Sequence, residues 1–258
     1  MDRIGNLLSI RLQNKQFITS YKVASSYLRT HICSPEDSLT HITFSYNPVG
    51  PLLVKPLSGK HLFFPGAFTS FSNSMSVTYV LTRDPLKRLL TGIVQAALIR
   101  TGPNDMFRNV PGIPQEFYDH VRLYLDLPAR DLIPYEKFYT GDTKHHMLLF
   151  FDTIIKEYMS YILKDPHCSE YHKLLYIYLK HINTGEFYTI DIDKDPFTLS
   201  MVLNDKSTSV KYSNKVFLTC LQEVYDNLPR THRVYQLIEK FCDQENSFKQ
   251  KVLSLQNT

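Results

Sequence analysis

The stretch SVTYVLTRDPLKRLLTGIVQAAL (Ser76–Leu98) decides the fold class, because it reads as a buried strand followed at once by a helix. Its first part, Ser76–Thr82, is rich in β-branched and aromatic residues and is apolar on both faces, as in a strand of a parallel sheet. Pro85 suits the first turn of a helix, and Asp84 suits the N-cap before it. Apolar residues then recur at three- and four-residue spacing as far as Leu98, which predicts a helix with one buried face.

The rest of the chain repeats this alternation of strands and helices. A strand is expected at Gln16–Tyr21, a helix from about Ser26 to Cys33, and a break with a new helix N-cap at Ser34–Asp37. Further helices are expected at 147–164, 169–182, 214–228 and 234–253, and a late strand at 187–192. The pattern predicts an α/β fold, with a mostly parallel central sheet flanked by helices and a helix-rich C-terminal half. Since no repeat or linker is visible, residues 1–258 are expected to form a single domain.

The composition is that of an ordinary globular chain, with 43% hydrophobic and 21% charged residues in 258. It excludes a disordered chain, a collagen-like repeat and a coiled-coil rod. The net charge is +4 and the basic residues are spread along the chain, so we expect an anionic ligand and no nucleic-acid partner. The first residues show no uninterrupted apolar stretch and the chain has no apolar run of about 18 residues, so neither a signal peptide nor a membrane span is expected. The four cysteines form no CxxC pair, which predicts reduced thiols and a cytoplasmic location.

A candidate anion site lies where the strand Gln16–Tyr21 gives way to a helix. Backbone N–H groups at a helix start are open to an anion, and the helix dipole adds partial positive charge there. Lys22 supplies a full charge, and Ser25 and Ser26 supply hydroxyl donors. The segment Lys22–Ser26 lacks the Gly-x-x-x-x-Gly-Lys-Ser/Thr loop of ATP and GTP enzymes. Taken alone, such a segment is more often an ordinary N-cap beside a solvated lysine.

A second candidate anion site follows the strand Ser76–Thr82. Arg83 offers a planar guanidinium that suits a phosphate, and Thr91 offers a hydroxyl eight residues later, about two helical turns on. The alternative is that Arg83 pairs with a structural carboxylate and that Thr91 lies on a helix surface. Ligands of open α/β sheets gather at the carboxyl ends of strands, so two such sites in one chain predict one shared anionic ligand.

With these two segments in this order, the chain resembles the sulfotransferases that use 3′-phosphoadenosine 5′-phosphosulfate (PAPS), and most of all the carbohydrate sulfotransferases. Their first signature, Lys-x-Gly-Ser/Thr-Ser/Thr after the first strand, is similar to Lys22–Ser26, with Ala24 in place of glycine. Their second signature, Arg-Asp/Asn-Pro-x-x-Arg-x-x-Ser, is similar to Arg83–Thr91. The resemblance implies a P-loop-like α/β fold and transfer of a sulfuryl group from PAPS, as co-substrate, to an acceptor hydroxyl.

The resemblance also implies roles for individual residues. The 5′-phosphosulfate would be held by Lys22, Val23, Ala24, Ser25 and Ser26, and the 3′-phosphate by Arg83 and Thr91, with Arg88 bracing the loop. Alanine at position 24 requires either a negative φ or a tolerated strain. A third likeness, to the late region of carbohydrate sulfotransferases, covers Asp165–Cys168 and Phe187–Asp191.

Sulfuryl transfer needs a base for the acceptor proton and a charge for the departing phosphate, and it requires no metal. Lys22 is predicted to supply that charge as a catalytic residue. Histidine suits the base because it titrates near neutral pH, and His61, between the two anion sites, is the first choice. Glu36, His31 and His41 stay open as alternatives. No metal site is predicted, because no His, Cys or Asp cluster has metal-ligand spacing.

Two functions from different classes follow. The first is a PAPS-dependent sulfotransferase that acts on a hydroxyl-bearing acceptor, a glycan or another small molecule. The alternative is a catalytically silent nucleotide-binding or interaction protein on the same scaffold. Ala24 and Thr91 favour this alternative, since they stand where the family has glycine and serine.

Overall fold

The chain forms two compact units in the computed structural model, which describes residues 3–29, 31–34, 37–45, 53–57, 77–101, 105–126, 142–181, 186–204 and 215–256. The first unit combines Met1–Pro85, Ser169–Val210 and Cys242–Thr258. The second combines Leu86–Cys168 and Lys211–Phe241. A single domain over residues 1–258 stays a prediction.

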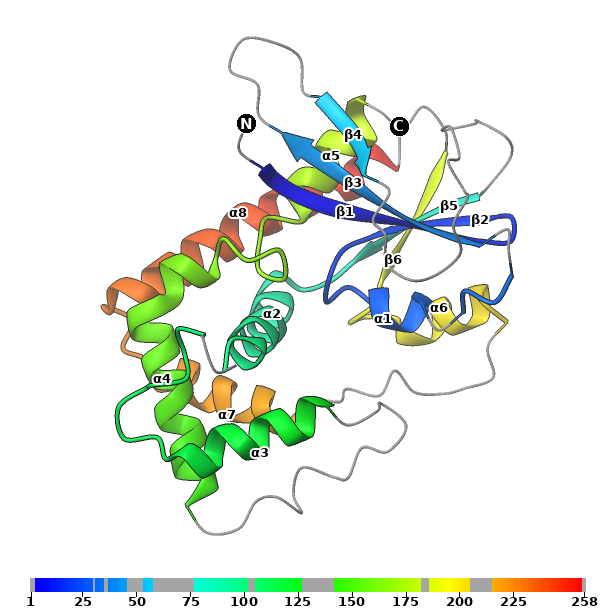
Figure 1. Ribbon diagram of the computed structural model, residues 1–258. Helices are drawn as coiled ribbons and strands as arrows, with labels where there is room; N and C mark the ends of the chain where they lie inside the picture. Colours follow the sequence, from blue (N-terminus) through cyan, green and yellow to red (C-terminus); the bar gives the residue numbers. More distant parts are fainter. Residues whose placement is uncertain are drawn as a thin grey trace. The chain divides into compact units, whose positions relative to one another are not determined.

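The first unit is built on a six-stranded sheet with the strand order β4-β3-β1-β2-β5-β6 (Figure 1). Its strands are β1 (Arg3–Leu12), β2 (Lys15–Thr19), β3 (Ser38–Ser45), β4 (Leu53–Leu57), β5 (Val77–Thr82) and β6 (Phe187–Asp191). β2 pairs with β5, and β5 with β6, in parallel. The other three pairings are antiparallel, so a mostly parallel sheet is not confirmed and the sheet is mixed. The local reason is the two-residue turn Gln13–Asn14, which folds β1 back on β2 as a hairpin.

Helices cover the sheet on both faces, as expected. Phe17 and Ile18 of β2 are both fully buried, although successive strand residues point to opposite faces. The covering side chains come from α1 (Ser25–Arg29), α5 (His172–His181), α6 (Pro196–Val202) and the end of α8 (Arg233–Leu255). In Figure 1, α1 and α6 lie below the strands, whereas α5 and α8 lie on the other side. Burying each large apolar side chain in such a core contributes roughly 1.5–3 kcal/mol.

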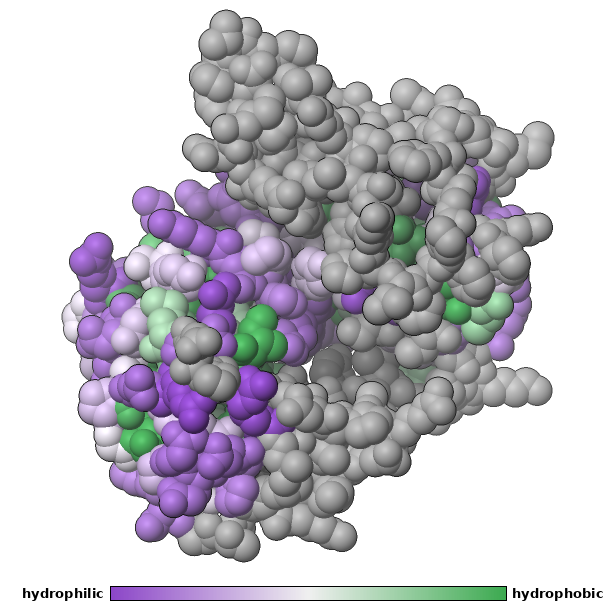
Figure 2. Space-filling view, in the orientation of Figure 1, coloured by the Kyte–Doolittle hydropathy of each residue, from purple (hydrophilic) through white to green (hydrophobic). Residues whose placement is uncertain are grey.

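The second unit is helical, which confirms the helix-rich C-terminal half. It contains α2 (Pro85–Ile99) from Leu86 on, α3 (Gln115–Asp126), α4 (Thr143–Ile162), α7 (Lys215–Asp226) and the start of α8. The apolar face predicted for α2 is buried at Leu89, Leu90, Ile93, Val94, Ala97 and Leu98. On the face shown in Figure 2, the described surface of this unit is mostly hydrophilic, with small separate apolar areas. Among the helices described, none has the length and apolar character needed to cross a membrane.

Candidate functional site

The loop that carries Lys22 lies at a sheet edge where two parallel strands end. β2 ends at Thr19, the turn Ser20–Ala24 follows, and α1 begins at Ser25. Since β5 runs parallel to β2 as its direct neighbour, Arg83 leaves the sheet at the same edge. The strand, turn and helix expected here are confirmed, although α1 is shorter than predicted.

The turn adopts a strained backbone conformation. Lys22 and Ala24 have φ values of 66° and 57°, in the left-handed region that favours glycine. Val23 between them is fully buried, and its carbonyl accepts a hydrogen bond from the Thr19 hydroxyl. The sulfotransferase signature has glycine at the position of Ala24. Alanine therefore stands here under tolerated strain, which costs about 1–2 kcal/mol.

Arg83 joins the two candidate anion segments directly. Its Nη1 donates a hydrogen bond of 2.8 Å to the carbonyl of Lys22, 61 residues earlier in the chain. Its side chain is only 6% exposed, and its Nε lies 3.5 Å from Oδ1 of Asp193. The two segments thus meet in the structure, and Arg83 also pairs with a carboxylate, as the structural alternative predicts.

The remaining signature residues occupy ordered helical positions. Ser25 is buried at the start of α1, and Ser26 follows it in the same helix. Thr91 lies in α2, where its Oγ1 donates a hydrogen bond of 2.7 Å to the carbonyl of Lys87. Arg88 is almost fully buried in the same helix. The first signature and Arg83 therefore belong to the first unit, whereas Thr91 belongs to the second.

The candidate bases are described only in part. His61 and Glu36 lie outside the described residues. His41 lies in β3, where the structure describes its backbone. His31 follows α1, and its Nδ1 lies 2.9 Å from the carbonyl oxygen of Tyr27. The identity of the base therefore stays a prediction.

The end of β6 carries Asp191, which belongs to the third likeness, and is followed by Asp193, which the sequence patterns did not single out. Oδ2 of Asp193 accepts a hydrogen bond of 2.7 Å from the N–H of Asp84. Asp191 accepts a hydrogen bond of 2.9 Å from Nζ of Lys249 in α8. Burial raises the pKa of Asp191, but Lys249 and nearby backbone N–H groups lower it more, so the pKa lies below its ordinary value. The available signal was the acidic run that follows the apolar part of the predicted strand 187–192.

The third likeness, Asp165–Cys168, forms a tight turn after α4. Oδ1 of Asp165 accepts a hydrogen bond of 2.9 Å from the N–H of His167 and lies 2.7 Å from the ring Nδ1. Nη2 of Arg100 donates to Oδ2 at 2.9 Å. Burial raises the pKa of Asp165, but these partners lower it far more, so the carboxyl titrates well below its ordinary range. Gly92 of α2 packs against this turn, because a Cβ there would lie 2.4 Å from the carbonyl oxygen of His167.

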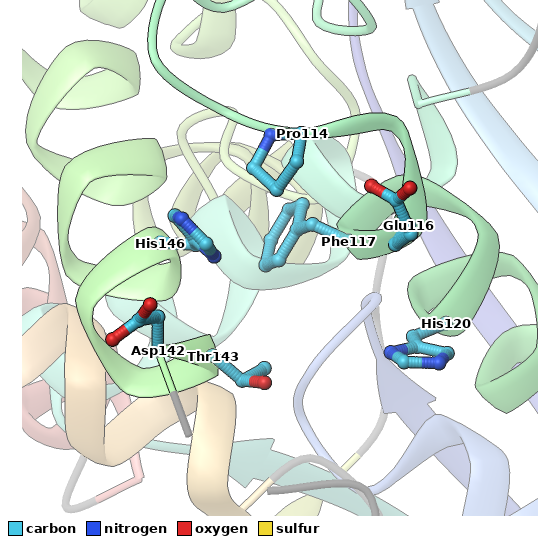
Figure 3. Close-up of a pocket in the computed structure, with 7 residues that line it drawn as sticks. All are labelled: Pro114, Glu116, Phe117, His120, Asp142, Thr143 and His146. Carbon is cyan, nitrogen blue, oxygen red and sulfur yellow. The ribbon is translucent and has the colours of Figure 1, made fainter. Parts of the chain in front are cut away.

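A pocket of about 180 Å³ lies in the second unit, between the starts of α3 and α4 (Figure 3). Its lining residues are Pro114, Glu116, Phe117, His120, Asp142, Thr143 and His146. In Figure 3 the ring of Phe117 lies below Pro114, with His146 on one side and Glu116 on the other. No residue predicted for nucleotide binding lines this pocket. Within the described ranges, no group of three or more His, Cys, Asp or Glu side chains is placed to hold a metal ion.

Comparison with protein-family models, curated proteins and solved structures finds no match to this chain. The sulfotransferase resemblance therefore rests on the residues of the two signatures themselves.

Proposed function

We propose that the protein is a PAPS-dependent sulfotransferase, with a carbohydrate hydroxyl as the acceptor. The observation that carries the proposal is the 2.8 Å hydrogen bond from Arg83 to the carbonyl of Lys22. It joins the two segments that resemble the family's 5′- and 3′-phosphate signatures. The proposed location is the cytoplasm, where the four thiols would stay reduced.

The position of this contact supports a phosphate ligand. Ligands of α/β sheets bind outside the carboxyl ends of parallel strands, and the contact lies where β2 and β5 end. Lys22 and Ala24 are left-handed, and left-handed residues are common in the concave arrangements of backbone N–H groups that bind anions. A guanidinium carries five N–H donors, so the group that holds a loop carbonyl can also contact a phosphate.

The proposed chemistry is an in-line sulfuryl transfer. The acceptor oxygen attacks the sulfur of PAPS, the bond from sulfur to the 5′-phosphate oxygen breaks, and its electron pair leaves with 3′-phosphoadenosine 5′-phosphate. Lys22 stabilises the charge on that leaving oxygen. His61 takes the acceptor proton, with Glu36, His31 and His41 as the alternative bases.

A second candidate function is a nucleotide-binding protein without catalysis on the same scaffold. The observation that favours it is the φ of 57° at Ala24, where the family has glycine. The ion pair between Arg83 and Asp193 also provides a purely structural use for the arginine. Release of 3′-phosphoadenosine 5′-phosphate from PAPS in the presence of acceptors separates the two functions.

Calorimetry with 3′-phosphoadenosine 5′-phosphate tests the proposal. Lys22→Ala and Arg83→Ala are each expected to weaken binding by roughly 10- to 150-fold, from charge-assisted contacts of about 1.5–3 kcal/mol. Lys180→Ala, which removes an exposed lysine from α5, is the matched control and should leave affinity unchanged. His61→Ala should retain binding and lose turnover. If the unaltered protein binds no nucleotide at millimolar concentration, the proposal is wrong.

A further inference from the structure

Asp193 stands at the centre of the contacts between the ends of β5 and β6. Its Oδ2 accepts the N–H of Asp84 at 2.7 Å, and its Oδ1 lies 3.5 Å from Nε of Arg83. The Asp193 side chain is 12% exposed and that of Arg83 is 6% exposed, so solvent screens this pair weakly. The Asp193 carboxylate therefore contacts both the backbone N–H of Asp84 and the side chain of Arg83, directly after β5.

The backbone that carries the Asp193 carboxylate is itself held in place by hydrogen bonds. The N–H of Asp193 donates to Oδ1 of Asp191 at 3.1 Å, and Oδ2 of Asp191 accepts from Nζ of Lys249 at 2.9 Å. The N–H of Ile192 donates to the carbonyl of Thr82 at 3.0 Å, which fixes this turn to the end of β5. These contacts fix the position of the turn that carries Asp193.

A fixed carboxylate at one edge of a guanidinium orients the whole group, because the guanidinium is rigid and planar. Asp193 contacts the Nε edge of Arg83, and Nη1 of the same group holds the carbonyl of Lys22. The hydrogen bond to Lys22 stabilises a turn that carries two left-handed residues. A chain of contacts therefore runs from β6 through Arg83 to the loop after β2.

We propose that Asp193 is a positioning residue of the nucleotide site, which acts through Arg83 to hold the Lys22 loop in its binding conformation. This inference rests on the proposed function. A different role for Asp193 predicts the opposite effect on nucleotide affinity. If its charge only competed with a bound phosphate for Arg83, then removing that charge would tighten nucleotide binding.

The test compares Asp193→Asn with two matched variants. Asparagine keeps an acceptor for the N–H of Asp84 and removes the charge beside Arg83. Asp195→Asn removes a charge two residues away at the N-cap of α6, where asparagine caps as well as aspartate. Arg83→Lys keeps the charge and removes the planar group. Near-UV circular dichroism and urea unfolding of each variant report whether the fold is kept.

Hydrogen exchange of the peptide that covers Ser20–Ser25 measures the loop without any ligand. Asp193→Asn and Arg83→Lys are each expected to speed its exchange by about tenfold, and the double variant no more than Arg83→Lys alone. Asp195→Asn should leave the rate unchanged. If Asp193→Asn leaves the exchange of this loop unchanged, or if the two changes multiply, the positioning role is refuted.

Affinity for 3′-phosphoadenosine 5′-phosphate supplies the second reading. Asp193→Asn is expected to weaken binding by about tenfold, with less than a twofold further loss when Arg83→Lys is already present. Tighter binding by Asp193→Asn overturns the inference and leaves the proposed function standing. Failure of the unaltered protein to bind overturns the proposed function instead, and the two failures are distinguishable for that reason.

Discussion

Replacing Ala24 with glycine is expected to stabilise the first unit. At a φ of 57°, alanine places its Cβ close to the backbone, which costs about 1–2 kcal/mol relative to a right-handed conformation. Glycine removes that cost, but it adds about 0.5–1 kcal/mol of conformational entropy to the unfolded chain. The midpoints of these two ranges differ by about 0.75 kcal/mol, which is the net gain expected for Ala24→Gly.

Urea unfolding followed by circular dichroism measures this gain. The slope of the free energy of unfolding against urea concentration is compared between the variant and the unaltered protein. Gln13→Gly is a matched control that is also expected to stabilise the protein, because Gln13 has a φ of 53° in the hairpin turn. Ala97→Gly is a second control, which is expected to destabilise the protein. It lies in the buried face of α2, where glycine costs about 1 kcal/mol before any loss of packing.

The reasoning fails if Ala24→Gly is no more stable than the unaltered protein while Gln13→Gly is more stable. That result would mean that contacts of the Ala24 methyl group outweigh the backbone strain. A gain at both positions together with a loss for Ala97→Gly supports the assignment of strain to the left-handed residues.

Three further predictions concern Gly92, Asp165 and Lys249. Gly92→Ala should lower stability by about 1–3 kcal/mol in thermal unfolding, because the new Cβ meets the carbonyl of His167 at 2.4 Å, and unchanged melting would contradict this. Because the pKa of Asp165 is lowered in the folded protein, the ionised carboxylate contributes its full stabilisation above about pH 4. This contribution to the free energy of unfolding is lost as the pH falls below that value. Asp165→Asn should therefore flatten the decrease in the free energy of unfolding between about pH 5 and pH 2. Lys249→Met should cost about 1.5–3 kcal/mol and raise the pKa of Asp191, which carboxylate titration by NMR would detect.

The parts of the fold that the sequence predicted are those with strong local signals. The buried strand before Arg83 and the helix after Pro85 are confirmed, because β-branched density and a regular apolar face are visible in a short window. The strand before Lys22 is confirmed for the same reason. β1, β3 and β4 were missed, and they form the antiparallel half of the sheet. In β1, Leu7 and Leu8 are both fully buried, so the alternation that marks a strand is absent.

Asp37 shows how a distant partner overrides a local signal. The sequence predicts a helix N-cap at Ser34–Asp37, but β3 begins directly after Asp37. The carboxylate instead accepts hydrogen bonds of 2.9 Å from the backbone N–H groups of Cys33 and Ser34, and another from Gln13 in the hairpin turn. Burial raises the pKa of Asp37, but these three N–H groups lower it below its ordinary value. A partner 24 residues away is invisible to a local reading of the sequence.

The same distinction applies to the candidate site. Lys22, Arg83 and their approach to one another follow from two short motifs and from the rule that parallel strands end at one edge. Asp193 does not follow from them, because its contact with Asp84 spans 109 residues and depends on where β6 enters the sheet. The motifs thus predict Lys22 and Arg83, but not the carboxylate that contacts Arg83.

The first unit is assembled from three separated stretches of chain, and this has a consequence for its synthesis. Lys249 and Val252, which complete its ion pair and its core, lie in the third of these stretches, Cys242–Thr258. A ribosome releases these residues only after the entire second unit has been made. Asp191 therefore lacks its lysine partner, and the core of the first unit lacks the end of α8, until the third stretch has left the ribosome.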